Sequence, residues 1–202
     1  MPKEDPSRRL FPYTAGFLWQ PRLRAILREA GYSLHAGLPG PRDRVVVWGR
    51  SPHSMRGEAV AARRGVGLVR LEDAFLRSVH PGRARGAGGP LGLFIDPFGV
   101  HFDASHPSLL ERLLAKEPLD DTALLDRARD GIARLKALNL SKYNDFDERL
   151  APPAPGYVLV IDQTAGDASI RHGGAHAATL REMLAVARLD DALERARSGS
   201  PV

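Results

Sequence analysis

VVVWGRSPHSMRGEAVAARRGVGLVRLED, residues 45–73, is the stretch of the chain that decides the fold. Its two apolar runs, 45–48 and 67–71, contain β-branched residues and are bounded by turn residues or a helical pattern, which is typical of buried parallel strands. The segment between them, 55–64, predicts a crossover helix. This strand–helix–strand unit predicts an α/β fold, a parallel sheet with flanking helices.

Outside this unit, the apolar run at 157–161 predicts a third buried strand, which follows a proline-rich loop. Residues 91–102 contain two strand-like halves around an Asp-Pro-Phe-Gly turn and predict a hairpin. Helical patterns predict further helices over 21–30, from residue 120 onward and over about 175–188.

The composition limits the function classes. With 202 residues the chain fits one domain, and its 43% hydrophobic and 26% charged residues are ordinary for a globular protein. It has no cysteine, which excludes disulfides and thiolate chemistry, and its seven histidines show no metal-ligand spacing, so no metal is expected. The net charge of +5 suits an anionic substrate, an anionic membrane surface or nucleic acid, but no dense basic stripe favours nucleic acid.

No apolar run approaches the roughly 20 residues that cross a bilayer, and the first ten residues lack the apolar core of a secretion signal. We therefore expect a cytoplasmic protein.

Polar residues follow each predicted strand, at 49–52, at 72–73 and at 162–169. Ligands of open parallel sheets bind beyond the carboxyl ends of the strands. We therefore expect these three loops to face one crevice.

Asp167 is the most informative of these residues, because Gly166 permits an unusual backbone angle just before it. Such a carboxylate can act as the nucleophile toward an anomeric carbon. The alternative is that Asp167 or Ser169 caps the next helix. Glu72 and Asp73 likewise have an alternative interpretation, as ordinary strand-end residues paired with Arg77.

Lys142, Tyr143 and Asn144 follow the helix that begins near residue 120. A cation beside an amide can hold a phosphate or a carboxylate. The alternative is that Ser141 and Asn144 are ordinary helix-end residues.

Five ordered segments together resemble the capsular polysaccharide export protein KpsC family, the retaining β-Kdo transferases that start the Kdo linker of lipid-anchored capsules. The resemblance covers about residues 43–188. The segments are VVVWGRSP at 45–52, VRLEDAFLRS at 69–78, GPLGLFIDPFGVHFDASHPSLLERLL at 89–114, LSKYN at 140–144 and VLVIDQTAGDASIRHGGA at 158–175.

The resemblance implies a GT-B glycosyltransferase with two Rossmann-like domains, of which this chain is the amino-terminal one. The first domain is expected to bind mainly the acceptor and the second mainly the donor CMP-Kdo. No other cofactor is implied. Asp167 matches the carboxylate that forms the covalent Kdo adduct. Glu72 matches an acidic residue that activates the acceptor or stabilises charge. Further motif positions, expected to bind substrate, are Asp73, Arg77, Ser78, Lys142, Tyr143, Asn144, Asp162, Gln163 and Ser169.

Two departures from the family matter. Ala74 stands where the family has glycine, which would strain a turn that needs a positive φ. The chain also ends where the family continues into the donor-binding domain. We therefore expect residues 1–188 to form the acceptor-side domain, residues 189–202 to form a polar tail, and the second domain to be absent.

The resulting hypothesis is a truncated transferase that moves Kdo from CMP-Kdo to a Kdo-primed lipid or oligo-Kdo acceptor and is inactive alone. Its expected partners are this donor, a Kdo-bearing glycolipid and a separate chain that supplies the second domain, with peripheral contact at the inner face of the cytoplasmic membrane and no nucleic acid. The alternative hypothesis is a non-catalytic module that binds an acidic glycan or another protein.

Overall fold

The chain divides into two compact units, Met1–Phe146 and Asp147–Val202. The computed structural model describes residues 5–80, 89–147, 149–151 and 153–198. None of the described helices is both long enough and apolar enough to cross a membrane.

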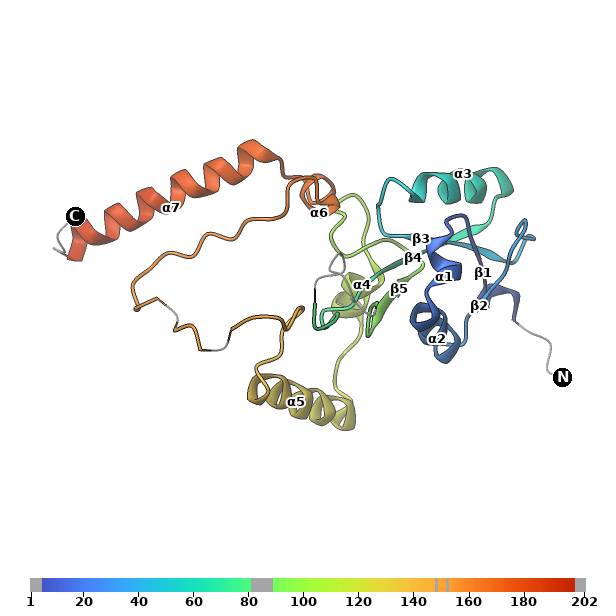
Figure 1. The fold of residues 1–202 in the computed structure, drawn as a ribbon, viewed down its shortest axis with the longest axis horizontal. Helices are drawn as coiled ribbons and strands as arrows, with labels where there is room; N and C mark the ends of the chain where they lie inside the picture. Colours follow the sequence, from blue (N-terminus) through green and yellow to red (C-terminus); the bar gives the residue numbers. More distant parts are fainter. Residues whose placement is uncertain (1–4, 81–88, 148, 152, 199–202) are drawn as a thin grey trace. The chain divides into compact units, whose positions relative to one another are not determined.

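The first unit is built on a five-stranded sheet with the order β2-β1-β3-β4-β5 (Figure 1). The neighbours among β1 to β4 are parallel, and β5 pairs antiparallel with β4 at the edge. The predicted α/β fold class and the strands at 45–48 and 67–71 are confirmed, whereas β1 and β2 were not predicted. The strands are β1 (Arg9–Pro12), β2 (Ser33–Leu34), β3 (Arg44–Trp48), β4 (Gly67–Asp73) and β5 (Leu93–Asp96).

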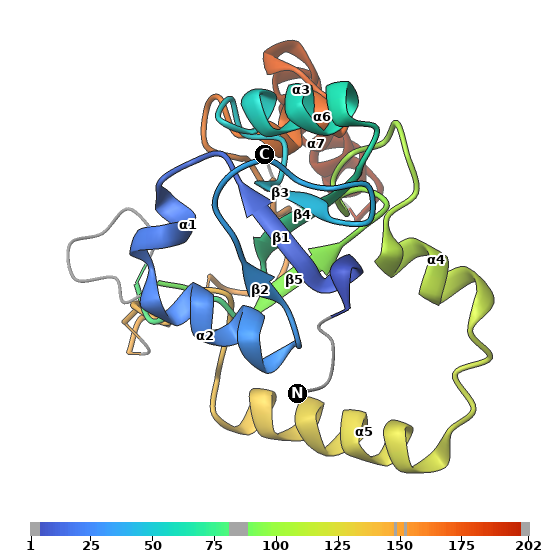
Figure 2. The same cartoon turned by 90° about the vertical axis from the view of Figure 1, so that its right-hand side faces the viewer.

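Helices cover both faces of this sheet (Figure 2). A short 3-10 turn, Pro6–Arg8, leads into β1. Helices α1 (Gly16–Trp19) and α2 (Pro21–Glu29) pack on one face, and α3 (Ser54–Arg64) packs on the other. The helices predicted over 21–30 and 55–64 are therefore confirmed.

The alternation of side chains along the strands sorts residues between these two faces. Val46 and Leu71 are buried with the residues of α1 and α2, whereas Val45 and Val47 pack with α3. Arg70 is the register partner of Val47. Arg70 therefore lies on the face that α3 covers, so the middle of β4 carries a charged residue under a helix.

The predicted hairpin over 91–102 is wrong. Only β5 is extended there, and its partner is β4. The cause is the Asp96 side chain, whose Oδ1 accepts hydrogen bonds from the N–H groups of Phe98 and Gly99 and whose Oδ2 accepts from Leu109. These three bonds turn the chain away from the sheet and into the next helix.

That helix, α4 (Leu109–Lys116), begins at a capping box, in which Ser108 and Glu111 exchange hydrogen bonds. Helix α5 (Thr122–Ala137) begins at Asp121, whose side chain accepts from the Leu124 N–H. The helix predicted from residue 120 is therefore confirmed. Neither α4 nor α5 has a buried residue, so both are peripheral to the core.

The second unit contains α6 (Ala168–His172) and α7 (Ala177–Ser198), and its predicted strand at 157–161 is wrong. Residues 158–161 are extended coil that lines an open groove against α7, and the Leu159 side chain is 71% exposed. High β-propensity does not make a strand unless a neighbouring strand bonds to its backbone.

The helix predicted over about 175–188 corresponds to α7, which continues into the predicted tail at 189–202; residues 199–202 lie outside the described part of the chain. The assignment of residues 1–188 to one acceptor-side domain stays a prediction.

Candidate functional site

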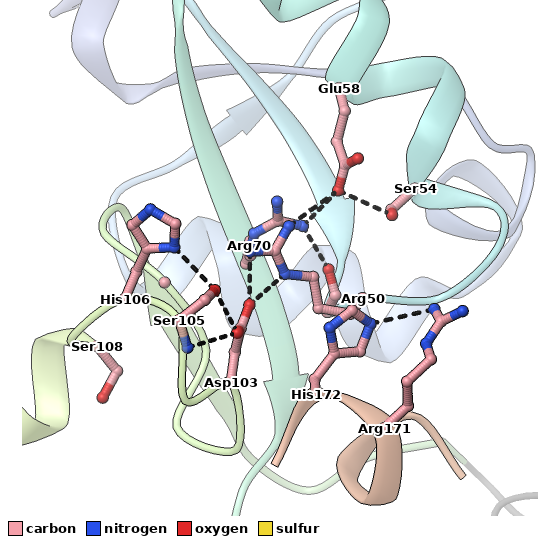
Figure 3. Close-up of polar contacts among 12 residues, drawn as sticks. Arg50, Ser54, Glu58, Arg70, Asp103, Ser105, His106, Ser108, Arg171 and His172 are labelled. Carbon is pink, nitrogen blue, oxygen red and sulfur yellow. Dashed lines mark hydrogen bonds and ion pairs between the residues drawn. The ribbon is translucent and has the colours of Figure 1, made fainter. Parts of the chain in front are cut away.

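A network of charged side chains lies where β3 and β4 end under α3 (Figure 3). The buried Arg70 guanidinium donates from Nη1 to the Gly49 carbonyl at 2.6 Å and to Glu58 Oε1 at 2.7 Å. The Ser54 hydroxyl also donates to Glu58 Oε1, at 3.0 Å. These bonds tie the first turns of α3 and the turn after β3 to the middle of β4.

Gly49 is the residue in this turn that positions Glu72. Its φ is +40°, and its N–H donates to the Leu71 carbonyl at 2.8 Å. A Cβ at this position would overlap Oε1 of Glu72. The backbone angle therefore favours glycine, and a side chain at this position would move the Glu72 carboxylate from the place it occupies.

The half-buried Glu72 and Asp73 lie within β4, whereas the sequence places them after it. The Asp73 N–H donates to Glu72 Oε2 at 3.3 Å. Ala74, which follows, is not among the described non-glycine residues with positive φ. The strain expected at Ala74 is therefore absent.

Asp103 joins a second loop to the network. Arg50 donates to Asp103 Oδ2 from Nε at 2.5 Å, and the hydroxyl and N–H of Ser105 donate to Oδ1 at 2.5 and 3.0 Å. Burial by itself would raise the pKa of this carboxyl, but the Ser105 bonds and Arg50 outweigh burial and lower the pKa to about 2. Asp103 is therefore ionised throughout the neutral range and holds Arg50 in place.

Asp103→Asn should destabilise the first unit by about 2 kcal/mol at neutral pH, because a carboxyl pKa of 3.8 when unfolded falls to about 2 when folded. Because the pKa of Asp103 is lower in the folded protein than in the unfolded chain, its ionised form stabilises the fold at any pH above about 4. This stabilisation is lost as the pH falls toward 2. The difference in unfolding free energy between wild type and variant should thus shrink between about pH 4 and pH 2, measured by urea unfolding.

The exposed Asp120 has no observed hydrogen bond or ion pair with a side chain of the described residues. Asp120→Asn is therefore the matched control and should change stability little. A deficit of Asp103→Asn that stayed constant down to about pH 2 would show that ionisation is not its source.

A small cavity of about 10 Å³ lies beside this network on the same face of the sheet. Glu72 is the register partner of Phe94, and Arg70 is that of Asp96, so the four side chains share one face. The cavity is lined by Arg70, Glu72, Phe94, Asp96, Val100, His101 and Leu110. It is too small for a sugar.

His101 closes the cavity among aromatic rings. Its ring centroid lies 5.2 Å from that of Phe94 and 5.9 Å from that of Phe75. The pKa of His101 is below its ordinary value, first because these rings exclude water from part of it and then because the Lys142 ammonium repels a second positive charge; Asp96 and Glu111 oppose this more weakly. The imidazole is therefore neutral at pH 7.

The two distant motifs at 77–79 and 142–144 lie side by side. The N–H groups of Arg77 and Ser78 both donate to the Lys142 carbonyl, at 3.1 and 3.3 Å, and the Asn144 N–H donates to the Val79 carbonyl at 2.8 Å. The Asn144 side-chain amide adds a bond to the Ser78 carbonyl at 3.3 Å. The structure thus brings these predicted site residues together across more than sixty residues of chain.

Most side chains of the paired segments 77–79 and 142–144 stabilise the loop that follows β4. Arg77 donates from Nε to Asp73 Oδ2 at 2.7 Å, so the predicted alternative of an ion pair is confirmed. The Ser78 hydroxyl donates to the His80 carbonyl at 2.6 Å. Lys142 is different, because it is exposed and has no carboxylate within ion-pair distance among the described residues. Its ammonium lies 5.7 Å from the ring centre of the half-buried Tyr143.

Asp167 lies in the second unit, whereas Glu72 lies in the first. It is the N-cap of α6, and its Oδ1 accepts from the Ser169 N–H at 2.8 Å and from the Ser169 hydroxyl at 2.7 Å. The capping alternative is therefore confirmed, and Gly166 has the positive φ, +81°, that the sequence suggested. The nucleophile assignment and the crevice shared with Glu72 stay predictions.

Asp162 and Gln163 are exposed in the coil before α6, and Asp162 Oδ1 accepts a bond from the Gln163 N–H at 2.6 Å. In the described ranges no group of three or more histidine or carboxylate side chains could hold a metal ion.

Sequence reasoning missed the residues that organise the site. Arg70 did give a signal, because it is a charged residue within an otherwise apolar strand segment. A charge buried in a sheet needs a partner of opposite charge or a hydrogen-bond acceptor. Arg50 was expected only as part of the loop 49–52, and Asp96 only as part of a turn. The contacts that join Arg50 to Asp103 and Glu58 to Arg70 gave no signal, because they link residues far apart in sequence. Phe94 and His101 were not predicted either.

Comparison with known proteins agrees with this architecture. The family described as "Capsule polysaccharide biosynthesis protein" matches residues 43–149, more than half of the chain. The capsule polysaccharide modification protein LipA of Neisseria meningitidis serogroup B is 34% identical over 151 residues, which are 72% of this chain and 21% of LipA. The lipopolysaccharide-processing protein LpsZ of Rhizobium meliloti is also 34% identical over 151 residues, 72% of this chain and 34% of LpsZ.

Two solved structures of Thermosulfurimonas dismutans KpsC are similar. The β-Kdo 2,4-transferase matches 92% of this chain with a TM-score of 0.79 and 31% identity, and the β-Kdo 2,7-transferase matches 81% with a TM-score of 0.53 and 25% identity. This chain spans 58% and 51% of those solved chains and smaller fractions of LipA and LpsZ. The resemblance to KpsC is thereby confirmed, and the chain belongs to the capsule polysaccharide biosynthesis protein family.

Proposed function

We propose that this chain provides the acceptor-side part of a retaining β-Kdo transferase, which moves Kdo from CMP-Kdo to a Kdo-bearing glycolipid during capsule synthesis. The observation that supports this most directly is the match of 92% of the chain, with a TM-score of 0.79, to the β-Kdo 2,4-transferase of T. dismutans. The location proposed is the cytoplasm, at the inner face of the membrane that holds the acceptor lipid.

The proposed chemistry has two displacements. An Asp167 oxygen attacks the anomeric carbon of Kdo, and the bond from that carbon to the CMP phosphate oxygen breaks, so CMP leaves with the electron pair. An acceptor hydroxyl then attacks the same carbon, Glu72 takes the hydroxyl proton, and the bond to Asp167 breaks. Two inversions give net retention. No metal or further cofactor takes part in this scheme.

The position of Glu72 supports its role as the base. Gly49 leaves room for its carboxylate, and the Arg70 bond to the Gly49 carbonyl holds the turn that faces it. A base must be held within hydrogen-bond reach of its substrate proton, and a clamped turn provides this rigidity. We propose that the exposed Lys142 also contacts the substrate.

The test uses the 202-residue chain alone and as a replacement for the segment of T. dismutans KpsC that it matches. With CMP-Kdo and a Kdo-primed acceptor, we expect the folded fusion to form the transfer product and the chain alone to form little, because transfer requires donor and acceptor to be positioned together away from water. Mass spectrometry of the acceptor measures the product.

A folded fusion without product would contradict the transferase assignment. Rapid turnover by the chain alone would contradict the restriction to an acceptor-side role. Retained binding of a Kdo glycoside without any transfer would favour the non-catalytic glycan-binding alternative.

A further inference from the structure

Phe75 is an exposed aromatic ring in a rigid setting. It lies just after Ala74, the residue that follows β4, and 63% of its surface is exposed. Its ring meets that of Phe94 edge to face, with centroids 4.9 Å apart, and lies 5.9 Å from the His101 ring. A large apolar side chain that is fixed by two rings and yet faces solvent is suited to binding a flat, partly apolar ligand.

The charges around this ring favour one class of ligand. Lys142 lies beside the loop that carries Phe75, because its carbonyl accepts hydrogen bonds from the N–H groups of Arg77 and Ser78 at 3.1 and 3.3 Å. Its side chain is exposed, and no described carboxylate pairs with it. Asp96 accepts three backbone bonds, Glu111 accepts from Ser108, and Glu72 lines the same cavity as His101. Lys142 has no carboxylate within ion-pair distance among the described residues, so its ammonium is available to pair with the anionic group of a ligand.

We propose that Phe75, His101 and Lys142 form a subsite for one acidic sugar, with its apolar ring face on Phe75, its carboxylate at the Lys142 ammonium and a hydroxyl at the His101 imidazole. This subsite rests on the proposed function, in which the acceptor ends in Kdo. It adjoins the proposed base, because Phe94, which supports Phe75, is the register partner of Glu72. A sugar held there would present a hydroxyl toward Glu72.

Two probes separate the contributions of ring and charge. The methyl β-glycoside of Kdo carries the carboxylate, and its methyl ester is the same sugar without the charge. Binding to the 202-residue chain is measured by NMR titration of backbone amide signals. We expect the acid to bind about tenfold more tightly than the ester, and Lys142→Met to abolish this preference.

Phe75→Ala should weaken binding of both probes about fivefold, whereas Phe75→Trp should retain it, because tryptophan keeps the stacking face. The matched control is Phe98→Ala, another exposed phenylalanine, 52% exposed, whose ring lies against the Arg112 guanidinium instead of against Phe94 and His101. It should leave both affinities unchanged. Thermal melting confirms that each variant is folded.

The proposal is overturned if Phe75→Ala binds as wild type does, if Phe98→Ala weakens binding equally, or if no amide near Phe75 and Lys142 shifts with either probe. A failure of transfer in the fusion, with the Phe75-dependent binding intact, would instead contradict the proposed reaction and leave the subsite standing.

Discussion

Asp167→Asn in the KpsC fusion is expected to reduce Kdo transfer by at least about 10³-fold and to abolish the covalent Kdo adduct, because an amide does not act as the nucleophile. Asparagine caps helices as well as aspartate does, so α6 should keep its N-cap. The substitution thus removes the proposed chemistry and keeps the observed structural role. Digestion of a trapped sample and mass spectrometry locate the adduct.

Ser169→Ala is the matched control, because it removes the hydroxyl bond to Asp167 Oδ1 and leaves both the carboxylate and the Ser169 N–H bond. It should retain an adduct on Asp167. Finding the adduct on another residue, or undiminished transfer by Asp167→Asn, would leave Asp167 with its capping role only.

Arg70→Met should lower the free energy of unfolding by about 3 kcal/mol, because it leaves the Glu58 carboxylate and the Gly49 carbonyl without their buried donor. Arg70→Lys should fall between wild type and Arg70→Met, since one ammonium cannot reproduce the geometry of a guanidinium fork. Urea unfolding measures both.

The double variant Arg70→Met/Glu58→Gln tests the cause. If the ion pair is responsible, the two substitutions should be less than additive, with a coupling of about 1 kcal/mol. Arg129→Met, which breaks an exposed pair with Asp126 on α5, should change stability by less than about 1 kcal/mol. Strict additivity of the first pair would show that Arg70 stabilises the sheet through Gly49 alone.

Local patterns predicted the elements whose partners are near in sequence. The strands at 45–48 and 67–71 and the helix between them form a unit whose apolar faces meet each other, so their patterns survive folding. The run at 157–161 has an equally strong pattern but no strand beside it among the described residues. The β-propensity of these side chains favours an extended backbone, but a strand also requires a neighbouring strand that bonds to its backbone.

The candidate site shows the same division. The motif at 142–144 was recognisable as a place where a cation and an amide gather, and the structure adds that Asn144 is used to hold the Ser78 loop while Lys142 remains available. Whether a side chain in this motif holds the loop or stays available for a ligand depends on the residues that it contacts. Those residues, at 77–79, are more than sixty positions away in the sequence.

The amino-acid order alone fixed the α/β class, the strand–helix–strand unit and the family, because these depend on periodicity and on motifs that are read along the chain. Folding in three dimensions decided that Arg70 clamps the Gly49 turn, that Glu72 lies against it and that Phe75 is supported by Phe94 and His101. The physical reason is that hydrogen bonds and ring contacts act over a few ångströms, and only the packed sheet brings these distant segments within that range.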